Sequence, residues 1–327
     1  MTETLKAGVV GVGKMGSHHA RVYSELPDIE LIGVNDVDAQ QASNVADRFD
    51  TTTLDRESLL ERADCVSVVV PTDYHYRVGM EAVRAGTHVL VEKPFVRDVD
   101  DGRELLSAAD RRGSVLQVGH IERYNPAFEA LRDVLVEVEP LAVAVRRQGP
   151  PVDRGGSDDV VFDLMIHDID IVTTVSDAPV ADISAIGIDD NAHVMAQLEF
   201  EDGLIATLTA SRVTQERIRD LAVTAEDCQI DVDYIDQSVE IHRHSLPEYV
   251  TDNGDVRYRH ESIIERPTIE NGEPLKNELR EFVTAVREGR EPRTPATQGL
   301  RAVEIAHRIK DEAEATEDEQ TMEVLNR

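Results

Sequence analysis

Lys93 is the residue of this sequence whose type and position first suggest chemistry. It follows the apolar run Thr87–Val91 and precedes Pro94, where a strand should give way to a loop. The chain has only five lysines, and nearly all of its other positive charge is arginine. A lysine can exchange its proton near neutral pH when burial or a nearby positive charge disfavours the ammonium, whereas arginine cannot. Lys93 is therefore a candidate to give or take a proton.

Asp163 and His167 form a second candidate pair, because they are four residues apart in a stretch that reads as a helix. Side chains at this spacing share one helix face, and a neutral imidazole titrates close to neutral pH. The carboxylate could orient the imidazole or bind a hydroxyl group. The alternative is a helix cap followed by a surface histidine. We expect no metal site at His167, Asp168 and Asp170, because no further ligands have suitable spacing.

A glycine pattern follows the first apolar run of the chain. It reads G-x-G-x-x-G and comprises Gly11, Val12, Gly13, Lys14, Met15 and Gly16. The first glycine permits a tight turn, the second lets the backbone approach a pyrophosphate, and the third lets helix and strand pack closely. The helix that follows would point its first amides at the phosphates. The pattern predicts a dinucleotide site, and a plain glycine-rich turn is the alternative.

Asp36 ends the second apolar run and lies twenty residues beyond Gly16. An acidic side chain at this spacing accepts hydrogen bonds from the adenosine ribose and repels a 2′-phosphate. Because no arginine directly follows Asp36, the sequence favours NAD over NADP. The alternative is that Asp36 or Asp38 only caps the next helix.

Strands and helices alternate through residues 1–120, which predicts a Rossmann domain with a doubly wound parallel sheet. Ligands of such folds bind at the carboxyl ends of the strands. The residues expected to line that crevice are the glycine pattern, Asp36, Pro71, Thr72, Lys93, Gly119 and His120. His18 and His19, in the first helix, are expected to be packing or solvent residues.

The character of the sequence changes in residues 121–327, which read as an α+β domain. A helix is expected over Ile121–Val138. From Val180 to His244 apolar residues alternate, as in antiparallel strands with one buried face, and Asp202-Gly203 reads as a hairpin turn. The acid-rich tail from Asp311 is expected to be frayed.

The composition is strongly acidic, with 65 Asp and Glu against 34 Lys and Arg and a formal net charge of −31. Such a charge repels itself at low salt and resembles that of proteins from salt-accumulating halophiles, so we expect a need for salt. No basic stripe exists to neutralise nucleic-acid phosphates. No signal pattern or apolar run of membrane length occurs, which predicts a soluble, cytoplasmic protein without a membrane partner. Cys65 and Cys228 read as small core residues.

Three features together make the sequence resemble the glucose–fructose oxidoreductase/inositol dehydrogenase (Gfo/Idh/MocA) family. They are the glycine pattern, Glu92-Lys93-Pro94, and Asp163 followed by His167. The resemblance covers nearly the full chain and implies a Rossmann domain followed by an open-faced, mostly antiparallel sheet.

This resemblance also implies roles for the candidate residues. Lys93 would contact both the nicotinamide and the substrate hydroxyl, beside a Lys–Pro bond that is often cis. Asp163 and His167 would bind the substrate, with His167 accepting the proton when an alcohol is oxidised. Glu92 and His75 would lie near the cofactor, and for His75 a helix-start role is the alternative.

A finer resemblance rests on Val118–Pro126 and Asp163–Asp170, which are similar to enzymes that oxidise the 3-hydroxyl of UDP-N-acetylglucosamine or its uronate. The residues that it places on the substrate side are Arg123, Tyr124 and Asn125. Arg154 could meet a diphosphate if the substrate is a nucleotide sugar, and an ordinary solvated arginine is the alternative.

The resemblance predicts an oxidoreductase that transfers a hydride between a secondary hydroxyl of a sugar or nucleotide sugar and NAD. The alternatives are an inositol or free-sugar dehydrogenase, and a glycoside hydrolase that keeps NAD bound. A non-catalytic sensor would have no need for Lys93, Asp163 and His167 together. The family commonly forms oligomers, so a homodimer or homotetramer is expected. Whether Lys93 or His167 is the base stays open.

Overall fold

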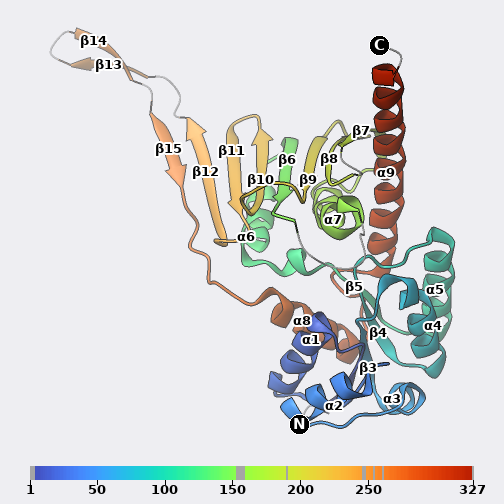
Figure 1. Ribbon diagram of the computed structural model, residues 1–327. Coiled ribbons are helices and arrows are strands. Elements are labelled where there is room, and N and C mark those ends of the chain that lie inside the picture. Colours follow the sequence, from blue (N-terminus) through green and yellow to red (C-terminus); the bar gives the residue numbers. More distant parts are fainter. Residues whose placement is uncertain are drawn as a thin grey trace. The chain divides into compact units, whose positions relative to one another are not determined.

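The computed structural model describes residues 4–151, 159–188, 191–244, 248–252, 255–259 and 261–325, and Figure 1 labels its elements. The chain folds into two compact units. The first comprises Met1–Tyr124 and Glu273–Ile305, and the second comprises Asn125–Gly272 and Ala306–Arg327. The sequence predicted a single boundary after residue 120. It did not predict that Glu273–Ile305 would return to the first unit.

The first unit is built on a five-stranded parallel sheet with the strand order β2-β1-β3-β4-β5. Its strands are β1 (Leu5–Val10), β2 (Ile29–Asn35), β3 (Cys65–Val68), β4 (His88–Glu92) and β5 (Leu116–Gly119). β3 and β5 are buried along their whole length, as expected for strands of a parallel sheet that is covered on both faces. The strand order reverses at β1, which pairs with both β2 and β3. The predicted doubly wound sheet is therefore confirmed.

Helices connect these strands, and acidic side chains begin three of them. The connecting helices are α1 (Lys14–Glu25), α2 (Ala39–Arg48), α3 (Arg56–Arg62), the 3₁₀-helix η1 (Thr72–Tyr74), α4 (His75–Ala85) and α5 (Val99–Arg112). Asp38, Asp55 and Asp98 accept hydrogen bonds from the first backbone N–H groups of α2, α3 and α5. α4 and α5 end at Gly86 and Gly113, which adopt the left-handed conformation that glycine tolerates.

Helices from the end of the chain complete the first unit. α8 (Pro274–Glu288) packs on α1, and its Leu279 and Phe282 enter the core around β1 and α2. α9 (Ala296–Leu325) begins in the first unit and continues in the second. It extends beyond Asp311, so the prediction of a frayed tail was wrong. The tail from Asp311 contains five Glu and two Ala, which are good helix formers.

The second unit is built on an eight-stranded sheet with the order β15-β12-β11-β10-β6-β9-β8-β7. Its strands are β6 (Pro140–Gln148), β7 (Val180–Ile188), β8 (His193–Phe200), β9 (Ile205–Ser211), β10 (Ile218–Ala225), β11 (Cys228–Asp233), β12 (Ser238–His244) and β15 (Ser262–Glu265). β6 and β9 pair in parallel, and the other neighbours pair antiparallel. The predicted Asp202-Gly203 turn joins β8 to β9. β13 (Glu248–Asp252) and β14 (Asp255–Arg259) form a separate hairpin (Figure 1).

The large sheet buries one face and exposes the other. Buried and exposed residues alternate along β6 and β8, and α6 (Pro126–Leu135) and α7 (Ile166–Val175) pack on strands of the sheet. The exposed apolar side chains on the other face are Leu141, Ile186, Ile188, Met195 and Ile205. This arrangement confirms the predicted α+β unit with an open-faced sheet. Among the described residues, no helix combines the length and apolarity of a membrane span.

The predicted helix over Ile121–Val138 was wrong in one respect, because it is interrupted. The 3₁₀-helix η2 (Ile121–Tyr124) ends before Asn125, whose backbone is extended, and α6 starts at Pro126. Proline disfavours a helical conformation of the residue before it, and the Asn125 side chain caps α6 by accepting from the Ala127 N–H.

Candidate active site

The glycine pattern lies at the point where the strand order of the parallel sheet reverses. Gly11 follows β1 with φ of 86°, and a Cβ there would lie 2.5 Å from the Val69 carbonyl oxygen after β3. A Cβ on Gly16 would lie 1.9 Å from the Gly11 carbonyl oxygen. These two glycines therefore allow the turn and the close packing of α1. In open parallel sheets, ligands bind at such a reversal.

Gly13 provides the test of whether a dinucleotide fits. A Cβ built on Gly13 would meet no described atom within 4 Å, and Gly13 is the residue from which α1 starts. The loop is thus open where a pyrophosphate would approach, and the first N–H groups of α1 are available as donors to it. Lys14 is exposed here, while Met15 packs against the core. The residues present therefore fit a dinucleotide.

Asp36 stands beside this loop and does not cap a helix. Its Oδ2 accepts a hydrogen bond from the Val12 N–H at 2.6 Å. The cap of α2 is Asp38, which accepts from the backbone of Gln40 and Gln41. The alternative reading of Asp36 as a helix cap is therefore wrong, and its carboxylate is placed at the carboxyl end of β2.

Lys93 follows directly on β4 and is half-buried, and the Lys93–Pro94 peptide bond is cis. Its backbone N–H donates to Oε2 of the buried Glu92 at 3.1 Å. Burial alone would raise the pKa of Glu92, but the hydrogen bond from His19 and the positive charge of Lys93 lower it. Glu92 is therefore an ionised carboxylate next to Lys93.

Pro71, Thr72 and His75 lie after β3, where the sequence predicts them. Pro71 is exposed and Thr72 begins η1. His75 is buried, with Nδ1 2.8 Å from the Pro94 carbonyl and Nε2 2.8 Å from the Val70 carbonyl. Burial lowers the pKa of His75, although the two carbonyl acceptors oppose that effect. His75 thus begins α4 and joins the ends of β3 and β4 through their backbone.

Asp163 and His167, in the second unit, lie across a change of helix type. Asp163 belongs to a π-helix, η3 (Val161–Met165), and His167 to the first turn of α7. Extra-wide turns of this kind occur frequently at functional sites. Asp163 forms an ion pair with Arg212, which follows β9, and both side chains are partly exposed. The predicted pair therefore has a cationic neighbour that sequence reasoning missed.

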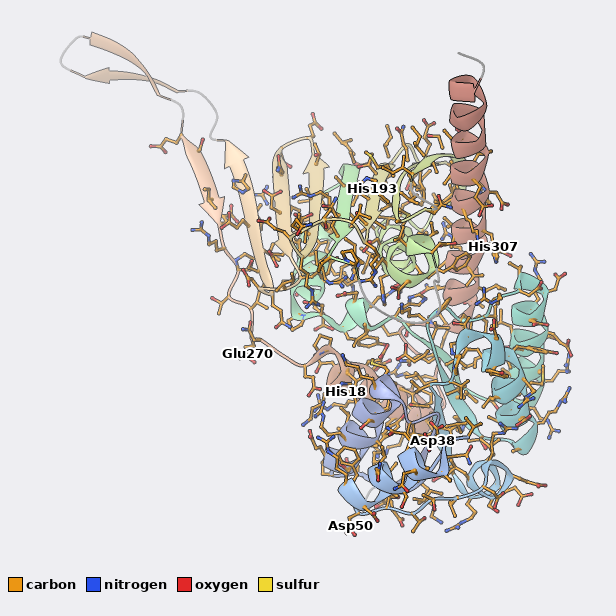
Figure 2. All side chains as sticks on the ribbon, viewed as in Figure 1. His18, Asp38, Asp50, His193, Glu270 and His307 are labelled. Carbon is orange, nitrogen blue, oxygen red and sulfur yellow. The ribbon has the colours of Figure 1, made fainter. Side chains whose placement is uncertain are left out.

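A buried ion pair holds α7 in place at Asp168, the residue that follows His167 in the sequence. Nε of Arg147, on β6, donates to Oδ1 of Asp168 at 2.8 Å, and the two side chains are only 2% and 1% exposed. At the other end of η3, the Phe162 ring meets the His307 ring edge-on at 4.9 Å. Figure 2 labels His307 on α9. Both contacts fix the position of the segment that carries Asp163 and His167.

The residues predicted on the substrate side have structural partners. Tyr124 is buried, its hydroxyl lies 3.1 Å from Oγ1 of Thr294, and burial raises the pKa of its phenol. The Asn125 side chain caps α6 and donates to the Tyr234 carbonyl at 3.1 Å. Arg123 is also buried. Arg154 lies outside the described residues.

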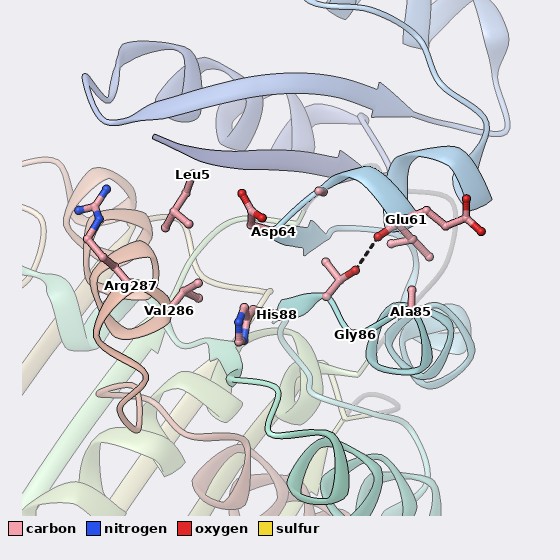
Figure 3. Close-up of a pocket in the computed structure, with 11 residues that line it drawn as sticks. Leu5, Glu61, Asp64, Ala85, Gly86, His88, Val286 and Arg287 are labelled. Carbon is pink, nitrogen blue, oxygen red and sulfur yellow. Dashed lines mark hydrogen bonds between the residues drawn. The ribbon is translucent and has the colours of Figure 1, made fainter. Parts of the chain in front are cut away.

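A cavity of about 460 Å³ lies at the other edge of the parallel sheet (Figure 3). It is lined by residues at the amino ends of strands, among them Leu5 of β1 and His88 of β4, and by Arg287 of α8. Ligands of doubly wound sheets bind at the carboxyl ends. We therefore do not assign this cavity to the cofactor.

Sequence reasoning also missed His19, which is fully buried and bonded to Glu92. The available signal was its place four residues before Tyr23 on one face of α1. Arg212 and Arg147 left no comparable signal, because their partners are 49 and 21 residues away in the chain.

Comparison with known proteins agrees with this fold. The model of the oxidoreductase family with an NAD-binding Rossmann fold (Gfo/Idh/MocA) matches residues 5–120, and the model of the family's C-terminal domain matches residues 140–232. The chain therefore belongs to the Gfo/Idh/MocA family. It is a nicotinamide-dependent dehydrogenase that acts on a CH–OH group.

Among its relatives is a UDP-N-acetylglucosamine 3-dehydrogenase of Acidithiobacillus ferrooxidans, 30% identical over 316 residues that cover 95% of this chain and 98% of the relative. A solved structure of that enzyme superposes with a TM-score of 0.86 at 29% identity, over 95% of this chain and 98% of the other. An inositol 2-dehydrogenase of Rhizobium meliloti is 28% identical over 327 residues, which cover 93% of this chain and 95% of the relative.

Proposed function

We propose that this protein uses NAD to oxidise a secondary hydroxyl of a nucleotide sugar of the UDP-N-acetylhexosamine type. The observation that carries the proposal is the position of Lys93, a half-buried lysine at the carboxyl end of β4 beside the ionised Glu92. The glycine loop that fits a pyrophosphate lies at the same edge of the same parallel sheet.

NAD is proposed over NADP because of Asp36. Its carboxylate stands at the end of β2, next to the glycine loop, where it would accept bonds from ribose hydroxyls. A 2′-phosphate would add negative charge beside this carboxylate, and like charges at contact distance repel.

His167 is proposed as the base and Lys93 as its helper. A carbinol carbon releases a hydride only as its hydroxyl proton is removed, and the nicotinamide supplies the hydride acceptor. Lys93 lowers the pKa of Glu92, so by reciprocity the Glu92 charge favours the ammonium form of Lys93. An ammonium donates a hydrogen bond to a developing alkoxide but cannot accept a proton. The half-buried imidazole of His167 can accept it.

The substrate class is supported by the relative that acts on UDP-N-acetylglucosamine, which matches this chain over nearly its whole length. Arg212, paired with Asp163, is a cation that could bind an acidic part of such a substrate. The inositol dehydrogenase relative supports inositol as the second candidate.

The test is a screen for NADH formation in high salt with UDP-N-acetylhexosamines, free sugars and inositols. We expect turnover with a UDP-sugar at a kcat/KM at least about tenfold above that of any inositol. Turnover with inositols alone would overturn the substrate class. Cleavage of a glycoside without net NADH release would identify a hydrolase instead.

We also propose that the protein forms a homodimer or homotetramer through the open sheet face. Ile186, Ile188 and Met195 are each at least half exposed on this face, and such apolar patches commonly mark interfaces. A monomer in light scattering at assay salt would contradict this proposal.

A further inference from the structure

A chain of buried hydrogen bonds runs under α1 to the residue before Lys93. The Tyr23 hydroxyl lies 2.8 Å from Oγ of Ser67, and Oγ lies 3.0 Å from Nδ1 of His19. Nε2 of His19 lies 3.0 Å from Oε1 of Glu92. Tyr23, Ser67 and His19 are all fully buried, so no exchange with bulk water replaces these bonds.

The chain can donate in one direction, toward Glu92. Burial raises the pKa of Tyr23, so its phenol stays protonated and can donate to Ser67. The Ser67 hydroxyl can then donate to Nδ1 of His19, and Nε2–H of His19 donates to Glu92. Each donor in the chain thus points toward the Glu92 carboxylate. Its second oxygen accepts from the Lys93 N–H.

We propose that His19 is a positioning residue for Lys93, acting through Glu92. This inference rests on the proposed role of Lys93. Without a hydrogen-bond donor, the buried Glu92 carboxylate would take up a proton. His19 donates to this carboxylate and so keeps it ionised. That carboxylate holds the backbone of Lys93 through its N–H and favours the ammonium form that the alkoxide requires.

The charged and titratable groups around this chain come from several elements. Those around Glu92 are His19 of α1, Lys93 after β4, His75 of α4 and His120, which follows the Gly119 paired with Glu92. Those around Tyr23 are Cys65 of β3 and Glu278 of α8. Burial raises the pKa of Cys65 to about 12, so its thiol stays neutral. His19 and Lys93 are thus the groups that stabilise the charge of Glu92.

His18 provides a matched control for His19. The two histidines are neighbours on α1, but His18 is exposed and His19 is buried. Figure 2 labels His18. We would replace each by leucine, which has no hydrogen-bond donor. His19→Gln, which retains an amide donor, is the conservative variant.

The first measurement uses the protein without cofactor or substrate. Reaction of each lysine with acetic anhydride is followed by mass spectrometry across pH, and the other four lysines serve as internal references. In His19→Leu, Glu92 becomes protonated and Lys93 should react at lower pH than in wild type, whereas His18→Leu should not differ. An unchanged pH dependence of Lys93 in folded His19→Leu would overturn the inference. If His19→Leu does not fold, Ser67→Ala must show the same shift, to a smaller extent.

The second measurement separates this inference from the proposed function. With the substrate found in the screen, His19→Leu should lower kcat about 10- to 100-fold, with partial rescue in His19→Gln and an unchanged Kd for NAD. Full turnover by Lys93→Ala would defeat the proposed function and leave the labelling result intact. An inactive Lys93→Ala together with a wild-type kcat for His19→Leu would defeat only the inference.

Discussion

The backbone N–H of Val12 donates to the Asp36 carboxylate at 2.6 Å, which joins the glycine loop after β1 to the end of β2. The Val12 carbonyl accepts from the Gln41 side chain at 2.8 Å, so α2 is attached to the same loop. The loop therefore has a fixed position relative to Asp36. This relationship makes cofactor preference a property that a single substitution can test.

Asp36→Ser removes the charge and keeps a short acceptor for the Val12 N–H. A hydrogen bond to a charged group contributes about 1.5–3 kcal/mol, so kcat/KM for NAD should fall about 10- to 100-fold. Activity with NADP should rise, because the repulsion is gone. Asp38→Ser is the control, since serine also caps α2 well. Steady-state kinetics give kcat/KM for NAD and for NADP in each variant. An unchanged preference for NAD over NADP in Asp36→Ser would contradict the role of Asp36.

Gly13→Ala and Gly16→Ala should separate binding from folding. A methyl group on Gly13 meets no described atom within 4 Å, so we expect a melting temperature close to wild type but a Kd for NAD at least about tenfold weaker. A methyl group on Gly16 would collide with the Gly11 backbone, so that variant should melt at a lower temperature. Wild-type NAD affinity in Gly13→Ala, by calorimetry, would argue against the pyrophosphate site.

Arg147→Met should destabilise the second unit. It removes the guanidinium from the buried Asp168 carboxylate, and breaking such a pair costs about 3–5 kcal/mol. The neighbouring Arg146 forms an exposed pair with Asp220, so Arg146→Met should cost less than about 1 kcal/mol. Denaturant unfolding in high salt compares the two variants. Equal midpoints would show that the buried pair does not anchor α7.

His88 predicts a pH dependence of stability. Its Nδ1 accepts from the Val115 N–H at 2.8 Å, and burial lowers its pKa below 6.5, an effect that the Asp64 charge partly offsets. A lowered pKa means that the unfolded chain binds the proton more readily. His88 therefore makes its full contribution to the free energy of unfolding above pH 6.5. This contribution is lost as the pH falls through the lower pKa that His88 has in the folded protein.

The variant His88→Asn keeps an acceptor for the Val115 N–H but does not titrate. The melting temperature of wild type should decline from pH 7 to pH 5 more steeply than that of His88→Asn. Parallel curves for the two proteins would show that His88 does not titrate differently in the folded and unfolded states.

The cofactor half of the site could be predicted from the sequence because its signals are local. The glycine pattern and Asp36 fall within one strand–helix–strand segment, and each glycine has a steric role that its position in the pattern already implies. Lys93 was predictable for the same reason, since a strand end followed by proline is visible in a few residues.

The partners of the supporting residues were not predictable, because these partners are distant in the chain. His19 was predicted to be a packing or solvent residue, and its partners Ser67 and Glu92 are 48 and 73 residues away. The π-helix at Asp163 is a single turn. Over so few residues, the spacing of apolar side chains does not distinguish a π-helix from an α-helix. The return of α8 to the first sheet is likewise unpredictable, because an apolar helix face does not specify its partner.

Lys93→Ala gives the most direct test of the central claim that Lys93 serves the oxidised hydroxyl. NADH formation should fall by about three orders of magnitude while the Kd for NAD stays near wild type. Lys276→Ala, which removes a partly exposed lysine paired with Glu25, should keep full activity. Wild-type turnover by Lys93→Ala on the true substrate would show that Lys93 does not serve the oxidised hydroxyl.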